Sequence, residues 1–146
     1  MTELAERIDR LESRQAVADL IHTYAKYIRS DQPEKIAGLF LPDGTFEVRN
    51  GHPDKDESEQ MSFDAGQGAI DAKMAAMKGS AHPVPLIRNL IVELDGDSAT
   101  ANCVMDAKIY GTPHGIIGEY RDTCRRVDGR WLFASRSFTM YKDAAQ

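Results

Sequence analysis

The apolar residues of the first thirty positions recur at the spacing of an α-helix. Between Leu4 and Ile28 charged residues separate a set of apolar side chains, namely Ile8, Leu11, Val17, Leu20, Ile21 and Tyr24. A single apolar stripe on an otherwise charged helix is typical of a helix that packs on one side only. The sequence therefore predicts a long amphipathic helix over 4–28.

Local signals divide the next fifty residues into short elements. Asp31, Pro33 and Glu34 match a capping box with a proline in the first turn, so a short helix is expected to follow and to stop at residues 42–44, Pro-Asp-Gly. Three further elements are expected: a strand over 45–48, a polar loop over 50–60 and a helix over 63–77.

Alternation of apolar and polar residues dominates the rest of the chain. Four such runs, over 86–94, 99–110, 116–127 and 131–141, are separated by turns rich in Gly, Pro and Asp. Helices followed by a meander of hairpins predict an α+β fold. We expect one domain over 1–146, with a curved antiparallel sheet whose concave face carries the N-terminal helices and encloses an apolar pocket.

Alternation also predicts which side chains face that pocket. In the run over 99–110, the inward set is Ala99, Ala101, Cys103, Met105 and Ala107. A two-residue turn at Asp128-Gly129 pairs Val127 with Arg130 and predicts the faces of the last hairpin. The expected inner face holds Tyr120, Asp122, Cys124, Trp131, Phe133 and Ser135, and the expected outer face holds Glu119, Arg121, Thr123, Arg125, Ala134 and Arg136.

Asp122 is the acid that this pattern singles out, because a carboxylate among aromatic residues is costly unless it is hydrogen-bonded, protonated or useful. Two interpretations stay open. Asp122 is either an acid–base group or a structural acid that accepts hydrogen bonds from a tyrosine hydroxyl or from the Trp131 N–H.

Composition narrows the class of protein. The chain has 146 residues, 42% hydrophobic and 28% charged, with a formal net charge of −5. These values are ordinary for a soluble domain, and nucleic acid is not expected as a partner because no basic face is evident. No apolar run predicts a signal peptide or a membrane span. The two cysteines, Cys103 and Cys124, are expected to be buried thiols too far apart to bridge, which favours a reducing, cytoplasmic location.

Several strings, in this order and spacing, resemble a known family. They are Leu11 to Val17 with Ile21 and Tyr24, Leu39-Phe40 with Asp43 to Phe46, Asn89 to Ala99, Tyr120-Arg121-Asp122, and Arg126 to Arg136. The chain resembles SnoaL-like domains of the nuclear-transport-factor-like superfamily, over nearly its whole length. The resemblance implies a cone-shaped α+β barrel, a homodimer or homotrimer formed through the outer sheet face, and a hydrophobic pocket.

Enzymes of this superfamily include scytalone dehydratase, polyketide cyclases, steroid isomerases and limonene epoxide hydrolase, and they move protons without a metal or an organic cofactor. The usual acid of the dehydratases falls at Arg29 here, and their usual histidine falls at Pro85. The nearest substitutes are Asp31 and His82. Asp31 also fits the capping box, and His82 also fits an exposed loop residue.

The sequence thus predicts a cofactor-independent lyase or isomerase acting on a small hydrophobic, oxygenated molecule. Asp122 or Asp31 would be the acid–base carboxylate, His82 the proton shuttle, and Tyr24 and Tyr120 the donors that polarise an oxygen. No metal site is expected. One alternative is a non-catalytic binding or accessory domain. Another is an epoxide hydrolase, for which an Asp–Arg–Asp grouping could draw on Arg29 or Arg136.

Overall fold

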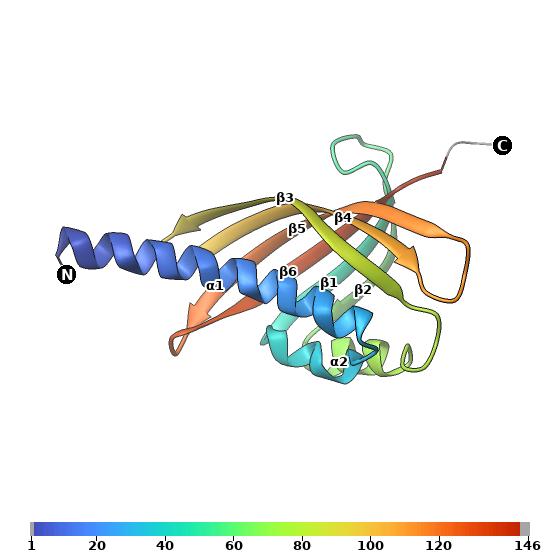
Figure 1. The fold of residues 1–146 in the computed structure, drawn as a ribbon, viewed down its shortest axis with the longest axis horizontal. Helices are drawn as coiled ribbons and strands as arrows, with labels where there is room; N and C mark the ends of the chain where they lie inside the picture. Colours follow the sequence, from blue (N-terminus) through green and yellow to red (C-terminus); the bar gives the residue numbers. More distant parts are fainter. Residues whose placement is uncertain (1, 144–146) are drawn as a thin grey trace.

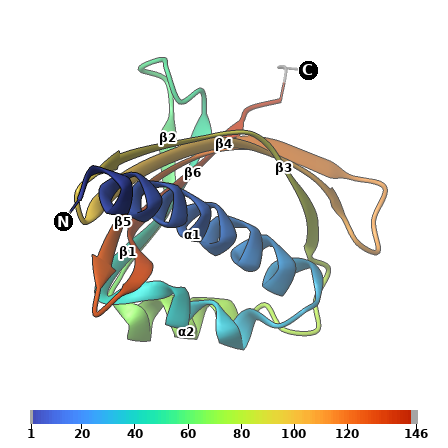
Figure 2. The same cartoon turned by 60° about the vertical axis from the view of Figure 1, so that its left-hand side comes forward.

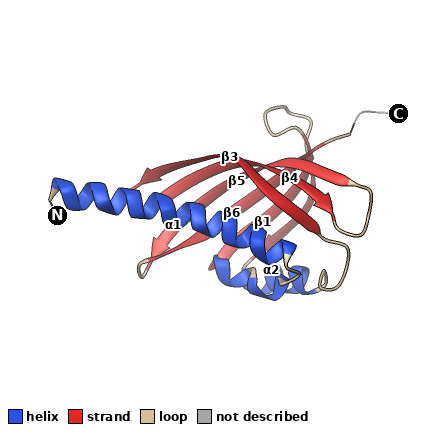
Figure 3. Cartoon of the chain, in the orientation of Figure 1, coloured by secondary structure: helices blue, strands red, loops and turns tan. Residues whose placement is uncertain are grey.

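A long helix, a curved six-stranded sheet and a short helix make up the fold. The computed structural model of the chain describes residues 2–143. The elements in chain order are α1 (Glu3–Arg29), 3-10 turns at Pro33–Lys35 and Ala37–Leu39, β1 (Phe40–Gly51), β2 (Glu59–Ala65), α2 (Gln67–Ala75), β3 (Pro83–Asp95), β4 (Ser98–Ile109), β5 (Gly115–Val127) and β6 (Arg130–Tyr141). Figure 1 shows α1 lying along one face of the sheet, and Figure 2 shows the sheet arching over α1 with α2 on the far side. Figure 3 separates the helices from the strands by colour.

The first helix matches its prediction. The side chain of Thr2 caps α1 by accepting a hydrogen bond from the Ala5 N–H at 3.0 Å. Acidic residues occupy its first turn and basic residues its last turn, which suits the helix dipole. Its second half buries Val17, Ile21 and Tyr24 against the sheet. The expected amphipathic helix over 4–28 is therefore confirmed.

The short helix expected after Asp31 is instead a pair of 3-10 turns, and the capping box is wrong. Gln32 precedes the first turn, and its side chain makes no capping bond. Asp31 has a positive φ of 54°, the left-handed conformation that commonly follows the last residue of a helix. Its carboxylate accepts the N–H of Gly79 at 3.1 Å and thereby holds the loop that follows α2.

The expected loop over 50–60 and helix over 63–77 also differ from the structure. Residues 59–65 form strand β2, which pairs antiparallel with β1 from Asn50↔Glu59 to Thr45↔Ala65. Gly66, with a φ of 91°, separates this strand from α2. The apolar spacing over 63–77 is therefore shared between a strand and a helix.

The sheet has the strand order β2-β1-β6-β5-β4-β3 and does not close into a barrel. Four pairings are antiparallel, whereas β1 runs parallel to β6. The sheet is thus mixed, although the sequence predicts an antiparallel one. The fold class is confirmed: helices pack on one face of a curved sheet whose inner side carries the core.

A β-bulge in the last hairpin moves Arg136 to the inner face. Cys124 pairs with Phe133, but Thr123 pairs with Ser135, so Ala134 is the extra residue. Beyond the bulge the alternation of β6 is reversed. The predicted faces of Ser135 and Arg136 are therefore wrong.

The inner face of β4 follows its prediction. Ala99, Ala101, Cys103, Met105 and Ala107 are all buried. Cys103 and Cys124 are both buried and free, as expected.

No helix in residues 2–143 combines the length and the apolar character that crossing a bilayer requires.

Candidate functional site

An apolar cavity of about 180 Å³ lies between the inner face of the sheet, the second half of α1 and α2. Its wall is mostly aliphatic, thioether and aromatic. The wall includes Tyr24, Phe46, Lys73, Met74, Pro85, Met105, Tyr120 and Phe138. Such a cavity selects molecules with a largely apolar body, and its few polar groups decide their orientation.

Two tyrosines supply hydroxyl groups to this wall. Tyr24 comes from the apolar stripe of α1, and Tyr120 comes from the inner face of β5. Their rings meet edge to face with centroids 6.1 Å apart, and Phe138 packs on Tyr120 at 4.8 Å. Both tyrosines predicted from the sequence therefore lie together in the cavity.

Behind these rings lies a buried ion pair. Asp122 of β5 and Arg136 of β6 are cross-strand neighbours, with Arg136 Nε 3.0 Å from Asp122 Oδ1 and both side chains 0% exposed. The guanidinium carbon lies 3.5 Å from the ring centroid of Tyr120, 4.2 Å from that of Tyr24 and 4.7 Å from that of Phe133. Such contacts stabilise a cation over aromatic faces.

The ion pair and the tyrosines perturb one another. Burial raises the pKa of Asp122 to about 6, although Arg136 acts in the opposite direction. Burial also raises the pKa of Tyr120 to about 12 and that of Tyr24 well above its usual value, with Arg136 opposing both shifts. Burial works against the charge of Arg136, yet Asp122 and the tyrosines raise its pKa. At neutral pH the two phenols therefore remain protonated donors beside a permanent cation.

Asp122 does not have the hydrogen bonds expected of a purely structural acid. Among the described residues, no tyrosine hydroxyl or Trp131 N–H donates to it, and Trp131 Nε1 is itself buried without an acceptor. The nitrogens of Arg136 likewise make no well-aligned hydrogen bond within residues 2–143. The pair is thus an ionic contact that leaves lone pairs and N–H groups unsatisfied.

The other two candidates from the sequence lie outside this arrangement. His82 precedes β3, where its ring packs on Tyr110 with centroids 5.5 Å apart and Nδ1 lies 3.0 Å from the Ser80 carbonyl oxygen. Asp31 is engaged with Gly79. Neither side chain is part of the cavity wall. The structure does not bring either side chain close to the two tyrosines of the cavity. The catalytic roles of His82 and Asp31 remain predictions.

The two positions at which this chain departs from the dehydratase pattern differ in their surroundings. Arg29 is exposed at the end of α1, whereas Pro85 is buried and forms part of the cavity wall. The wall therefore carries an apolar group where the pattern has a histidine.

Sequence reasoning missed a polar cluster at the same cavity. Lys73 of α2 lines the wall, its ammonium donates a hydrogen bond to Ser62 Oγ, and Nζ lies 3.2 Å from Asp64 Oδ2. Interpreting 63–77 as one helix concealed the cluster. Treating 59–65 as a strand places Ser62 and Asp64 on one face, which is the signal that could have revealed it.

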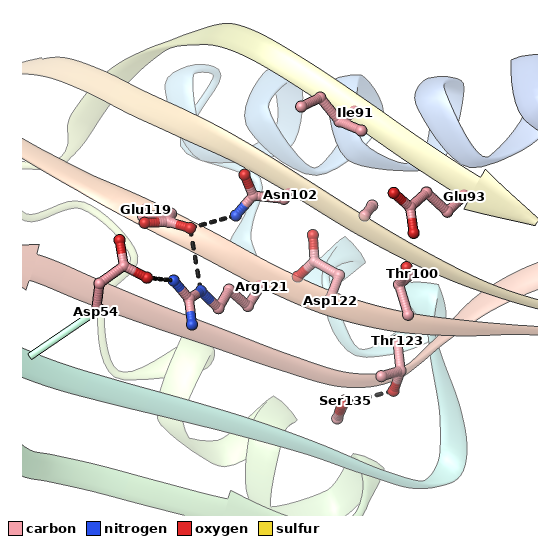
Figure 4. A pocket seen from close by; sticks show the side chains of 11 residues that line it. Asp54, Ile91, Glu93, Thr100, Asn102, Glu119, Arg121, Asp122, Thr123 and Ser135 are labelled. Atoms are coloured by element: carbon pink, nitrogen blue, oxygen red, sulfur yellow. Dashed lines mark hydrogen bonds and ion pairs between the residues drawn. The ribbon is translucent and has the colours of Figure 1, made fainter.

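A larger hollow of about 700 Å³ lies on the outer face of the sheet (Figure 4). Arg121 bridges Glu119 and Asp54 there, and Asn102 also donates to Glu119. These groups satisfy one another, and the hollow is lined largely by polar side chains. The inner cavity is therefore the better candidate for an apolar ligand.

Within residues 2–143, no cluster of three or more His, Cys, Asp or Glu side chains is arranged to hold a metal ion.

The architecture and the sequence are similar to known proteins. The family model described as a SnoaL-like domain matches residues 9–137. An NTF2-like protein with a cystatin-like fold from Novosphingobium aromaticivorans is 25% identical, with a TM-score of 0.74 over 99% of this chain and 92% of that one. A protein from Mycobacterium tuberculosis, described as of unknown function, is 24% identical, with a TM-score of 0.74 over 96% of this chain and 76% of that one.

A third structure, provisionally described as a scytalone dehydratase from Novosphingobium aromaticivorans, is 19% identical, with a TM-score of 0.70 over 94% of this chain and 91% of that one. Among proteins with curated descriptions, none matches. Because the family model spans most of the sequence and the architecture is similar to that of NTF2-like structures, the chain belongs to the SnoaL-like domain family.

Proposed function

We propose that the protein is a cofactor-independent lyase or isomerase that transfers protons on a small hydrophobic, oxygenated molecule held in the inner cavity. One observation carries the proposal: two buried tyrosines of the cavity wall lie against the guanidinium of Arg136, which is paired with buried Asp122. Membership in a family that includes dehydratases and isomerases supports the same chemistry.

The tyrosines would polarise an oxygen of the ligand. Because Tyr24 and Tyr120 stay protonated, each can donate a hydrogen bond to a carbonyl or to a departing hydroxyl. As negative charge develops on that oxygen, the cation of Arg136 behind the rings stabilises it in a poorly hydrated environment. A donor of this kind typically contributes a factor of about a hundred to a thousand in rate.

Asp122 would be the proton acceptor. Its pKa of about 6 leaves it mostly ionised at neutral pH, but near enough to neutrality to exchange a proton. Its charge raises the pKa of both tyrosines, although neither hydroxyl donates a hydrogen bond to it. Since Asp122 is not in the cavity wall, we propose that a tyrosine side chain shifts toward it when the ligand binds, and that its hydroxyl then relays the proton between ligand and carboxylate.

Hydrogen–deuterium exchange tests this proposal without knowledge of the natural substrate. Purified protein in heavy water should catalyse exchange of the α-protons of a small ketone with one oxygen, such as acetophenone, and NMR follows the exchange. Tyr24→Phe, Tyr120→Phe and Asp122→Asn should each lower this rate about a hundredfold or more. Tyr27→Phe is the matched control, because Tyr27 is only half-buried on the flank of α1 and should leave the rate unchanged.

The second candidate is a non-catalytic binding domain, and one observation favours it. The described wall of the cavity contains no carboxylate and no histidine. Ketones that bind with micromolar affinity but show no accelerated exchange would support this alternative and refute the lyase or isomerase.

We also propose that the protein forms a homodimer or homotrimer through the outer face of the sheet. Leu86, Ile91 and Ile117 are 52%, 58% and 48% exposed there, and Leu86 and Ile117 flank Asp106 across three strands. Exposed apolar patches of this kind are typical of association surfaces. Light scattering should show an oligomer that Ile117→Lys dissociates. If only Leu11→Lys on α1 dissociates it, the interface lies on the helix instead.

A further inference from the structure

The size of the inner cavity limits what it can hold. Its volume is about 180 Å³. An apolar cavity of about 150 Å³ accommodates a benzene molecule, whereas sites for drug-sized ligands span about 300–1,000 Å³. A single substituted ring therefore fits, and a fused four-ring skeleton does not.

The polar groups of the cavity wall are not confined to the tyrosine pair. Among the described residues that line it, Lys73 is the one with a charge. An ammonium has three N–H groups. One donates to Ser62 Oγ and the charge faces Asp64 at 3.2 Å, which leaves Lys73 with donor capacity that no other described residue takes up.

Lys73 and the tyrosine pair flank the same phenyl ring. The centroid of Phe46 lies 6.4 Å from that of Tyr24 and 6.0 Å from Lys73 Nζ. All three residues line the cavity. A ring placed against Phe46 could therefore present one substituent to the tyrosines and another to the ammonium.

Asp64 decides the chemistry of the second substituent. It already balances the charge of Lys73, and both side chains are less than a third exposed. A carboxylate on the ligand would add an unbalanced negative charge to this half-buried pair, whereas a neutral carbonyl or hydroxyl oxygen would add none.

From this arrangement we infer that the ligand is a single substituted ring with two oxygen functions. One faces Tyr24 and Tyr120, and the other is a neutral acceptor that receives a hydrogen bond from Lys73. This inference rests on the cavity of the proposed function and makes Lys73 a specificity-determining residue.

Binding calorimetry with matched probes tests it. We expect p-hydroxyacetophenone, which has a phenol and a ketone oxygen, to bind about tenfold more tightly than p-ethylphenol, which lacks the ketone. Lys73→Met should abolish this difference, because it should weaken the binding of p-hydroxyacetophenone and leave that of p-ethylphenol unchanged. Lys78→Met is the control, because Lys78 lies outside the cavity and pairs with Glu34.

The remaining probes address charge and size. p-Hydroxybenzoate should bind more weakly than p-hydroxyacetophenone to the unaltered protein, and Asp64→Asn should reverse that order. Estradiol, a four-ring phenol, should not bind. If Lys73→Met fails to fold because Asp64 loses its partner, the double variant Lys73→Met/Asp64→Asn removes both charges and should show the same loss of discrimination.

Each outcome bears on one claim. The ligand class would be overturned if Lys73→Met weakened the binding of p-hydroxyacetophenone and p-ethylphenol equally, or if estradiol bound tightly. Failure of both phenols to bind would overturn it as well. Discrimination by Lys73 without proton exchange would leave the ligand class standing and refute only the proposed catalysis.

Discussion

Asp122 and Arg136 face each other across β5 and β6 at 3.0 Å, and neither side chain reaches solvent. Placing two charges in an apolar interior costs several kcal/mol per ion, which their mutual attraction repays only in part. The pair is therefore weak as a stabilising element, and its position directly behind Tyr24 and Tyr120 agrees with a role in the site.

Removing one member of this pair should be more damaging than replacing both. Arg136→Met leaves the Asp122 carboxylate buried without a cation and should cost about 3–5 kcal/mol of unfolding free energy at neutral pH. The double variant Asp122→Leu/Arg136→Met should regain most of that loss, or exceed the stability of the unaltered protein. Urea denaturation measures all three proteins. A double variant no more stable than Arg136→Met would contradict the prediction.

The raised pKa of Asp122 makes stability depend on pH. The folded protein binds this proton with a pKa of about 6, against the usual 3.8. The contribution of Asp122 is therefore fully present below about pH 4 and is lost as the pH rises through about 6, a change of about 3 kcal/mol.

The measurement is the difference in unfolding free energy between the unaltered protein and Asp122→Leu/Arg136→Met, followed across this pH range. Other carboxylates titrate in both proteins and cancel. A difference that stays flat would show that Asp122 keeps its usual pKa, and one that grows in favour of the unaltered protein with rising pH would show that its pKa is lowered.

Gly118 shapes the cavity through a close approach. A Cβ at this position would overlap the ring of Phe138 and the carbonyl oxygen of Thr139. Gly118→Ala should therefore displace Phe138 from Tyr120, cost about 1–3 kcal/mol and weaken ligand binding. Gly68→Ala in α2 is the matched control. Nothing lies within 4 Å of its added Cβ, and alanine should stabilise the helix by about 0.5–1 kcal/mol. Thermal unfolding and calorimetry distinguish the two.

Arg126 of β5 connects the first half of α1 to the sheet through hydrogen bonds. Its Nη1 and Nη2 contact the two carboxylate oxygens of Asp9 at 2.9 and 3.2 Å, and its Nε donates to Asp97 at 2.8 Å. Arg126→Lys replaces this planar fork by a single point of contact. Hydrogen exchange should then speed up in the first half of α1 and stay unchanged in its second half.

Arg130→Lys, at an exposed position beyond the β5–β6 turn, serves as the control. Arg126 also lowers the pKa of Asp9 by hydrogen bonding. The protection that this contact gives should thus be present at neutral pH and disappear in acid, as the pH falls through that lowered pKa. If the hydrogen-exchange protection of the first half of α1 depends on neither Arg126 nor pH, packing alone causes it.

The sequence by itself determined the first helix, the last four strands and most of their faces. The 3.6-residue spacing of α1, the turn at Asp128-Gly129 and the alternation along β4 depend on near neighbours in the chain, so local physics suffices to predict them. Tyr24, Tyr120 and Asp122 were found for the same reason, since each lies in a segment whose periodicity is uninterrupted.

Only the tertiary structure decided that Arg136 joins Asp122, that β1 runs parallel to β6 and that Lys73 reaches the cavity. Alternation predicts a face only while the register holds, and one extra residue at Ala134 reverses every later side chain. Pairings between segments distant in the chain, such as Phe46↔Arg136, are selected by packing the whole sheet, and no local pattern records them.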